Sequence, residues 1–590
     1  MNRLKDGVHI LALLLAANLR GILCGRVHGS VRRIGQAVFA AIRLRGSPRV
    51  LRLVDLCLES GVPVERLARN TEAAYVIGSR MNAERDYAAA FELASRMIRE
   101  RGESAKLLTV RGNANISLGR YSEGLADLNR VAELNPVFAR DLAIHPTRSY
   151  LFGLRGELDA ARKAMAEQML PPGSMEEPAA GLARFLYEQL APYWRDNAAK
   201  GEVAVVIGDF QVAVGHAILD PYHYIQLFRH RFDHFILVHP PYDWFTPATR
   251  VAAFIHDSHF DQIETTDIHA HRFGWKYLDE LRCKNVTFLV HHYWSLNRQV
   301  FLARKDPNHP LSRGRLYFEV PPKLAHRAES VLHRAGFDFE RPFVVIHTRE
   351  HGYHAFGAQS YRNTDIRNYL PALRRLVELG YHVVRIGDRK MTSIRAELPE
   401  VVELPLHDDY IHAIDPFVIS RCRFMISCQS GPCSYARAFG KPNLVLNAVY
   451  HYTLLPERQE LLGFKNYRDR ATGESLDLDR IFRIGAHLFD NTDHFVQAGI
   501  AVEDMTADEI LAATEEMLDW LDHPDRPETR SQTRFRERME WYSANPDPSH
   551  PLANAMSDYI GYSLPECRIS DAVCRLRPGF LETTADKKAA

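Results

Sequence analysis

Residues 342–388 read PFVVIHTREHGYHAFGAQSYRNTDIRNYLPALRRLVELGYHVVRIGD, and the rest of the architecture can be built outward from them. Two short apolar runs, PFVVIH and HVVRI, flank an amphipathic segment at 363–381. Short β-branched runs on either side of such a segment are typical of a strand–helix–strand unit. Thr364 or Asp365 is expected to cap the helix, and Gly380 to lie near its end.

The same alternation continues in both directions along the chain. Downstream, CRFMISCQSGP at 422–432 predicts a strand and a loop, CSYARAFGKP at 433–442 a helix, and NLVLNAV at 443–449 another strand. Upstream, three apolar runs predict buried strands, at 202–210, 234–241 and 285–292. Strands that alternate with helices indicate parallel βαβ units. The sequence therefore predicts two Rossmann-like halves in series, the GT-B architecture.

An all-α region is expected before the first strand. Alanines and leucines recur at helical spacing over residues 65–170. RDYAAAFELASRMIRE and GRYSEGLADLNRVAELNP place Tyr87 and Tyr121 34 residues apart, which is the period of tetratricopeptide (TPR) repeats. A third, weaker copy begins at Gly156, and a Pro/Gly-rich linker follows at 170–178. The alternative is a plain helical domain without repeat ancestry.

Composition excludes several classes of protein. The chain has 590 residues, 46% of them hydrophobic and 25% charged, as in ordinary globular proteins. The net charge of +1 argues against a general polyanion binder, so no nucleic-acid partner is expected. The 8 cysteines show no zinc-ligand spacing, which favours a reducing, cytoplasmic compartment.

The first 64 residues form a basic, amphipathic segment. The run from Val8 to Leu19 is shorter than the roughly 20 residues needed to span a bilayer. Basic amphipathic segments bind anionic membrane surfaces. We therefore expect residues 1–52 to make peripheral contact with the inner face of a bacterial inner membrane. An ordinary packed helix and true insertion are the alternatives.

A nucleotide-sugar transferase must stabilise a diphosphate as it leaves, either with a metal or with basic side chains and backbone N–H groups. For the metal route, Asp477 and Asp479 form the clearest DxD triplet, but they precede a helical stretch and are interpreted as a solvated helix start. No metal and no cofactor beyond the sugar donor is expected.

The turn after the strand near residue 427 suits the second route. Ser427, Ser430 and Gly431 follow the apolar run, and Pro432 is expected to open a helix. Glycine lets a phosphate approach the backbone, and the helix N-terminus supplies N–H groups. The alternative is an ordinary strand–turn–helix connection with a good cap.

A second group of candidates follows the strands of 342–388. His347 and Arg349 end the first strand, where open α/β sheets bind ligands, and an arginine fork suits phosphate. A structural histidine, and a salt bridge from Arg349 to Glu350 or Asp388, are the alternatives. Asp388 either accepts from a base or ribose hydroxyl or caps a turn. Arg362, with its neighbours, either faces the same cleft or belongs to a helix cap.

The catalytic base is expected in the first Rossmann-like half. QVAVGHAILDPYHY follows its first strand and is predicted to be a loop that carries His216. Histidine suits general-base chemistry at neutral pH. Asp220 is the alternative base.

Several motifs resemble known transferases. SGP and ARAFGKPNLVLN resemble the donor segment of lipopolysaccharide heptosyltransferases, with Ser430 for their Thr, Phe439 for Leu and Gln429 for Asp. IHTRE resembles the His-x-Arg strand end of O-fucosyltransferase-like enzymes. HTREHGYH, YRNTDIRNYLPAL, GYHVVRIGD, FGKP and RISDAVCRLRPGFL are similar to a family of bacterial GT-B glycosyltransferases, over about 200–580. The resemblance implies phosphate binding by Arg349, Ser430 and Gly431.

The predicted organisation is a basic segment, a TPR-like domain, acceptor and donor Rossmann-like domains and an irregular tail with a short ordered piece, at 1–64, 65–170, 200–335, 336–523 and 524–590. The expected activity is metal-independent transfer of a hexosyl, deoxyhexosyl or heptosyl group from a nucleotide sugar to a cell-surface glycan or lipid-linked acceptor. Two alternatives remain: transfer to proteins selected by the TPR-like helices, and a non-catalytic scaffold that binds a glycan or nucleotide.

Overall fold

The computed structural model describes most of the chain between residues 71 and 582. The described ranges are 71–84, 86–142, 144–154, 201–207, 213–239, 246–264, 277–283, 286–291, 293–334, 337–350, 357–450, 455–489, 491–545 and 561–582, with single positions at 54–70 and 157–167. The chain divides into two compact units, and the boundary between them falls within residues 152–176. The basic residues of 1–52 and the linker at 170–178 lie outside the described residues, so the predictions made on them stay predictions.

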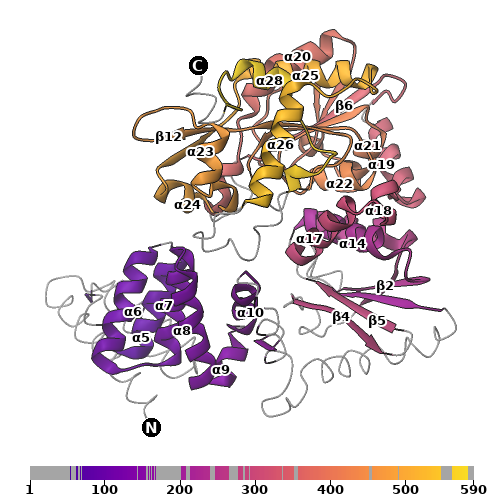
Figure 1. Cartoon of the computed structure of the whole chain (residues 1–590). Helices are drawn as coiled ribbons and strands as arrows, with labels where there is room; N and C mark the ends of the chain where they lie inside the picture. Colours follow the sequence, from indigo (N-terminus) through magenta and orange to yellow (C-terminus); the bar gives the residue numbers. More distant parts are fainter. Residues whose placement is uncertain are drawn as a thin grey trace, which may run out of the picture. The chain divides into compact units, whose positions relative to one another are not determined.

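The first unit consists of helix hairpins that repeat along the chain (Figure 1). Its helices are α5 (Thr71–Ala83), α6 (Tyr87–Arg101), α7 (Ala105–Ser117), α8 (Tyr121–Leu134), α9 (Pro136–Asp141) and α10 (Ile144–Leu154). Tyr87 and Tyr121 are the first residues of the second helix in successive hairpins, as the 34-residue echo predicts. The weaker third copy from Gly156 lies largely outside the described residues.

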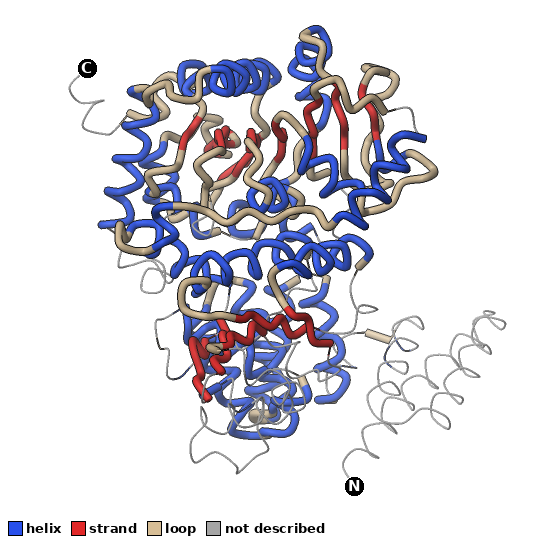
Figure 2. The backbone as a smooth tube through the Cα atoms, turned by 90° about the vertical axis from the view of Figure 1, so that its right-hand side faces the viewer, coloured by secondary structure: helices blue, strands red, loops and turns tan. Residues whose placement is uncertain are grey.

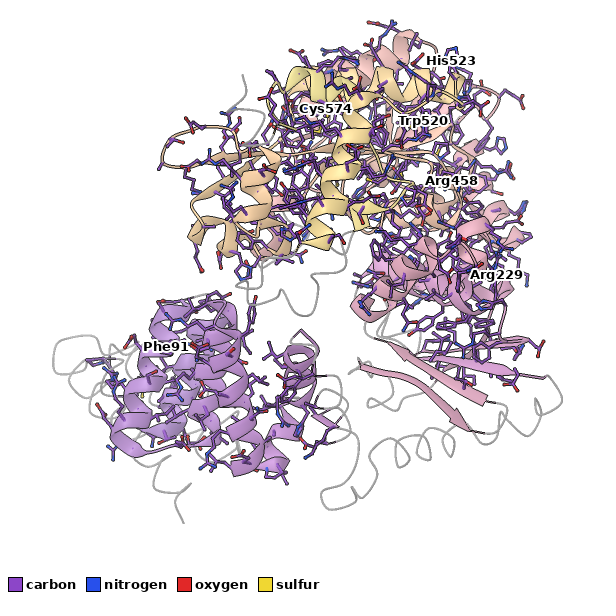
Figure 3. All side chains as sticks on the ribbon, in the orientation of Figure 1. Phe91, Arg229, Arg458, Trp520, His523 and Cys574 are labelled. Carbon is purple, nitrogen blue, oxygen red and sulfur yellow. The ribbon has the colours of Figure 1, made fainter. Side chains whose placement is uncertain are left out.

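Small residues let these helices approach one another closely. A Cβ added at Gly124 of α8 would lie 2.6 Å from Ile116 Cγ1 and 3.1 Å from the Gly112 carbonyl oxygen of α7. The Arg120 guanidinium lies over the ring of Phe91, 5.0 Å from its centroid, where α8 meets α6 (Figure 3). The all-α, TPR-like prediction is therefore confirmed over residues 71–134.

The second unit begins with a five-stranded sheet in the order β3-β2-β1-β5-β4. Its strands are β1 (Val203–Ile207), β2 (His234–His239), β3 (Asp261–Glu264), β4 (Tyr277–Cys283) and β5 (Val286–His291). β1, β2, β3 and β5 are parallel, as predicted, whereas β4 forms an antiparallel hairpin with β5. The sequence predicted only β1, β2 and β5, so β3 and β4 are additions to the expected sheet.

The helices of this half are α14 (Val214–Phe228), α15 (Pro247–Ile255), α17 (Tyr293–Lys305), α18 (Pro310–Arg313) and α19 (Pro322–Arg334). α14 follows β1. Both α15 and α17 pack against α14, and α17 also contacts β5. The last of them, α19, leads into the second sheet and packs against one of its helices.

The second sheet has seven parallel strands in the order β14-β11-β10-β9-β6-β7-β8. Its strands are β6 (Phe343–His347), β7 (His382–Arg385), β8 (Val401–Glu403), β9 (Phe424–Ser427), β10 (Asn443–Ala448), β11 (Glu460–Phe464) and β14 (Arg568–Ile569). The four central strands are those the sequence predicts. A separate antiparallel pair is formed by β12 (Asn466–Asp469) and β13 (Ile500–Glu503).

Helices cover both faces of this sheet (Figures 1 and 2). One face carries α20 (Leu370–Glu378), α25 (Ala507–Asp522) and α28 (Asp571–Leu576), which share a core with the strands. The opposite face carries α21 (Ile414–Arg421) and α22 (Cys433–Ala438), which pack against α19 and α14. With one largely parallel and one fully parallel sheet in series, the predicted fold class is confirmed: two Rossmann-like halves preceded by a helical domain.

The C-terminal region is more ordered than predicted. α26 (Arg530–Ala544) begins at a capping box formed by Thr529 and Gln532. β14 extends the sheet beyond β11, and the Arg568 guanidinium lies 5.0 Å from the ring of Trp520 on α25 (Figure 3). An irregular tail at 524–590 is thus wrong for the described residues, apart from the short ordered piece expected near 567–581.

The remaining helices are short: α23 (Leu478–Arg483), α24 (Thr492–Gln497) and several 3₁₀ turns. None of the helices in the described part of the chain combines the length and apolar character needed to span a membrane.

Candidate functional site

Both sheets contain a point where the chain reverses its direction of strand addition. In the seven-stranded sheet, β7 and β8 add on one side of β6, and β9 then returns to its other side. In the first sheet, β2 and β3 add on one side of β1, and β5 returns to the other. Ligands of open α/β sheets bind beyond the carboxyl ends of the strands at such a point. The candidate site therefore lies beyond β6 and β9.

His347 and Ser430 meet at this point. His347 is opposite Ser427 in the β6–β9 register, and its Nδ1 lies 2.9 Å from the Ser430 Oγ. Burial, with the nearby guanidinium groups of Arg385 and Arg349, lowers the pKa of His347 to about 3. The imidazole is therefore neutral at physiological pH, and it holds the turn after β9 against the end of β6.

Arg349 lies two residues beyond the end of β6 and is 8% exposed. Its backbone N–H donates to Cys428 Sγ at 3.1 Å. Its guanidinium donates to Asn363 Oδ1 at 3.2 Å and to Gln359 Oε1 at 3.4 Å. These acceptors are neutral amide oxygens.

Arg362 lies beside Arg349. It donates through two nitrogens to the Gln429 carbonyl oxygen, at 3.1 Å from Nε, and through Nη1 to Gln359 Oε1 at 2.9 Å. Two guanidinium groups thus donate to one amide oxygen. Convergent guanidinium groups are a common way to bind phosphate.

The salt bridge proposed as the alternative role of Arg349 involves a different arginine. Arg385 of β7 is fully buried and pairs with Glu350 and with Glu403, the latter at 2.6 Å. Glu350 also accepts from the backbone N–H of Thr392 at 2.6 Å. This network holds Glu350, the residue next to Arg349, in place. The Glu350 carboxylate, one of the two expected salt-bridge partners of Arg349, therefore pairs with Arg385 instead.

Two predicted donor residues have other roles in the structure. The Ser427 hydroxyl is completely buried and donates to Asn443 Oδ1 at 2.9 Å, in a network with Glu460 and Arg437. Ser427 is therefore a core residue and does not face the site. Asp388 Oδ1 accepts from the Lys390 N–H at 2.6 Å, which is the turn-capping role left open by the sequence.

The turn after β9 also differs in detail from its prediction. Pro432 is the N-cap of α22, one position before the first helical residue. The first N–H groups of this six-residue helix are already used, since Cys433, Ser434 and Tyr435 donate to the carbonyls of Ser430, Gly431 and Pro432. The N-terminus of α22 therefore has fewer free N–H groups to donate to a bound anion than the sequence predicts.

Gly431 is required for a backbone contact between the two halves. A Cβ at this position would lie 3.0 Å from the Gly215 nitrogen and 3.2 Å from Val214 Cβ. Both of these residues belong to the first turn of α14, where the sequence predicted a loop. The turn beyond β9 therefore touches the segment that follows β1, the corresponding strand of the other half.

His216 is the residue after Gly215, so it lies in the first turn of α14 beside this contact. Its Nδ1 lies 3.1 Å from Asp220 Oδ2, one helical turn later. The His216 side chain is 41% exposed and that of Asp220 is 14% exposed. A carboxylate that orients a partly exposed imidazole is the arrangement of a general base and its orienting group.

Asp415 is a buried carboxylate with a shifted pKa that the sequence does not single out. It lies in the first turn of α21, and its Oδ2 accepts from the Tyr410 hydroxyl at 2.8 Å. Its Oδ1 is buried and has no hydrogen-bond partner in the described part of the chain. Burial raises the pKa of Asp415 to about 7. Only packing of α21 against α22 and the strands creates this environment.

Replacing Asp415 by Asn should stabilise the protein at pH 8 by a few degrees and have little effect near pH 4. An unfolded Asp titrates near pH 3.9. Between about pH 4 and 7 the unfolded state releases this proton while the folded state keeps it, so stability falls as pH rises. Thermal unfolding at both pH values checks the prediction, and an equal shift at pH 4 and 8 would contradict it.

Both aspartates of the DxD triplet, Asp477 and Asp479, already accept hydrogen bonds within the protein. Asp477 caps α23 by accepting from the Arg480 N–H at 2.8 Å, as the helix-start interpretation predicts. Asp479 is not solvated, because Arg538 and Tyr542 both bond to it. Within the described residues, no group of three or more His, Cys, Asp or Glu side chains has the geometry to hold a metal ion.

Among the comparisons with known proteins, only the comparison with solved structures finds matches. No family model matches the sequence, and no curated protein is similar to it. A glycosyl transferase family 9 structure from Veillonella parvula is 10% identical, covers 54% of this chain and 97% of its own, and has a TM-score of 0.32. The E. coli ADP-heptose lps heptosyltransferase II is 12% identical over 42% and 84% of the two chains, with a TM-score of 0.25.

An O-GlcNAc transferase mutant from Thermobaculum terrenum is 13% identical, covers 88% of this chain and 94% of its own, and has a TM-score of 0.26. The assignment of the fold rests on the strand orders of the two sheets, which do not depend on these scores.

Proposed function

We propose that the chain is a GT-B glycosyltransferase that binds a nucleotide-diphosphate sugar beyond β6 and β9. One observation carries the proposal: the turn after β9 touches the first turn of α14, which contains His216, and Arg362 donates to the Gln429 carbonyl of the same turn. A basic group of one Rossmann-like half and a cationic group of the other thus both lie next to the turn that follows β9. Such a site suits the transfer of a group from a phosphate to a hydroxyl.

In the proposed reaction, Arg349 and Arg362 bind the diphosphate and stabilise the charge that develops on it. His216, oriented by Asp220, removes the proton from the acceptor hydroxyl. The acceptor oxygen bonds to the anomeric carbon of the sugar while the bond from that carbon to the diphosphate oxygen breaks. Nucleoside diphosphate leaves, and no metal or further cofactor takes part.

For the acceptor we favour a cell-surface glycan or a lipid-linked intermediate, with residues 1–52 in peripheral contact with the membrane. The helical unit supports a second candidate, a protein acceptor, because stacked helix hairpins form extended surfaces that bind polypeptides. Glycoproteomics of a deletion strain distinguishes the two. Loss of surface polysaccharide with unchanged protein glycans would exclude the protein acceptor.

Replacing His216 by Ala is expected to lower turnover by a factor of about 10²–10⁴, the usual contribution of a positioned general base. The assay follows release of nucleoside diphosphate from a panel of nucleotide sugars. Asp220→Asn should lower turnover less, because the imidazole remains but loses its orienting charge. His523→Ala is the matched control, since His523 is an exposed histidine at the far end of α25 (Figure 3).

Two results bear directly on the assignment. Unchanged turnover in His216→Ala would remove this residue from the reaction. A folded wild-type protein that turns over no nucleotide sugar would favour the scaffold reading of the chain.

A further inference from the structure

Gln359 occupies an unusual position between two cations. Its Oε1 accepts from Arg349 Nη1 at 3.4 Å and from Arg362 Nη1 at 2.9 Å. The two arginines approach from different segments, one just after β6 and the other at the end of the 3₁₀ turn Gly357–Arg362. The amide oxygen therefore lies at the point where both guanidinium groups aim.

An amide oxygen carries only a partial negative charge. Arg349 also donates to Asn363 Oδ1 and Arg362 to the Gln429 carbonyl, and both of these acceptors are neutral oxygens as well. A hydrogen bond from guanidinium to an anionic oxygen is roughly twice as strong as one to a neutral oxygen. An anionic ligand oxygen would therefore be bound more tightly at the position of Gln359 Oε1 than the amide itself.

The backbone at Gln359 departs from the turn that surrounds it. Within Gly357–Arg362, Gln359 has φ −117° and ψ 30°, outside the helical range, so the 3₁₀ turn is broken at this residue. The segment after it is firmly held, because Lys465 Nζ donates to the Asn363 carbonyl at 2.6 Å and Thr364 donates to Asp504 at 2.9 Å. Gln359 thus lies at a break in the turn, whereas the segment that follows Arg362 is anchored.

We propose that Gln359 is a placeholder, whose amide oxygen occupies the position taken by a phosphoryl oxygen of the donor and leaves it when the donor binds. The inference rests on the proposed function, and it defines where the diphosphate lies between the two arginines. It also assigns Gln359 a role that opposes binding, in contrast to the residues around it.

Three variants test the placeholder. Gln359→Glu puts a carboxylate between the arginines, where it competes with the ligand, and should raise the Kd for inorganic pyrophosphate and for nucleoside diphosphates at least tenfold. Gln359→Ala removes the competing oxygen and should leave the Kd within threefold of wild type or lower it. Gln497→Glu makes the same substitution at an exposed position on α24 and should change nothing.

The measurement is calorimetric titration of the full chain with pyrophosphate, UDP, GDP and ADP, and thermal unfolding without ligand confirms that each variant is folded. A tenfold loss of affinity in Gln359→Ala would overturn the proposal, because Gln359 would then bind the ligand. Wild-type affinity in Gln359→Glu would overturn it as well, as would a wild-type protein that binds none of the probes. A further result separates the two proposals. If the wild-type protein binds pyrophosphate but no nucleoside diphosphate, and Gln359→Glu weakens the binding of pyrophosphate, the role of Gln359 would stand and the sugar-donor function would be rejected.

Discussion

Replacing Arg349 by Ala is expected to weaken nucleoside diphosphate binding about 100-fold, equivalent to about 3 kcal/mol. The guanidinium is buried next to the ends of β6 and β9, and its removal leaves Arg362 as the remaining phosphate ligand of the proposed pair. Arg349→Lys should fall between wild type and Arg349→Ala, since lysine keeps the charge but loses the planar fork. Titration calorimetry on the folded variants measures the change.

Arg367 provides the matched control for this experiment. It lies in the 3₁₀ turn after Asp365, its side chain is 55% exposed, and it pairs with Glu397 at 3.5 Å. Arg367→Ala should bind nucleoside diphosphate as the wild type does. Equal losses in Arg349→Ala and Arg367→Ala would mean that net charge, and not the position of Arg349, controls binding.

Replacing Arg304 by Met should destabilise the second unit by about 3–5 kcal/mol, the usual cost of removing one member of a buried ion pair. Arg304 of α17 is 1% exposed and pairs with Glu457, which is 2% exposed and precedes β11. It also donates to the Pro456 carbonyl at 2.7 Å. This pair joins the two Rossmann-like halves, and its loss leaves the buried Glu457 carboxylate with the longer contact to Arg315, at 3.4 Å, as its remaining ion pair.

Urea unfolding of the full chain measures this effect, and two further variants interpret it. Replacing both Arg304 and Glu457 by Met should recover much of the lost stability, because no unpaired charge remains. Arg468→Met breaks an exposed pair with Glu503 and should cost less than about 1 kcal/mol. Similar effects in Arg304→Met and Arg468→Met would contradict the account of a buried charge.

The sequence predicts the central strands well and the outer strands poorly. β6, β7, β9 and β10 contain runs of apolar residues, β-branched in β6 and β7, because strands buried on both faces have no polar side. By contrast, β8 has three residues and β14 has two, too few to show any pattern. β14 becomes a strand through pairing with β11, which is a long-range effect that a local pattern cannot contain.

The α26 helix illustrates a different kind of failure. Its sequence, RSQTRFRERMEWYSA, is strongly polar, so the apolar stripe that marks most amphipathic helices is weak. Only Phe535 and Met539, four residues apart, enter the core among its apolar side chains. The capping box of Thr529 and Gln532 is the local sequence signal for the start of this helix.

The sequence indicates candidate residues but not the contacts that they make. It predicts His347 and Arg349 as candidates because they end a recognisable strand, and Ser430 because a turn follows the next one. The inward direction of Ser427, the shared acceptor Gln359 and the burial of Asp415 depend on which segments meet in three dimensions. A single sequence contains no local pattern for such proximity.

The most direct test of the account is titration calorimetry of the full wild-type chain with UDP, GDP, dTDP, ADP and CMP. The account predicts that one base series binds without added metal and that Arg349→Ala abolishes most of this affinity. A folded protein that binds none of these nucleotides, or that binds one equally well without the Arg349 side chain, would contradict a donor site beyond β6 and β9.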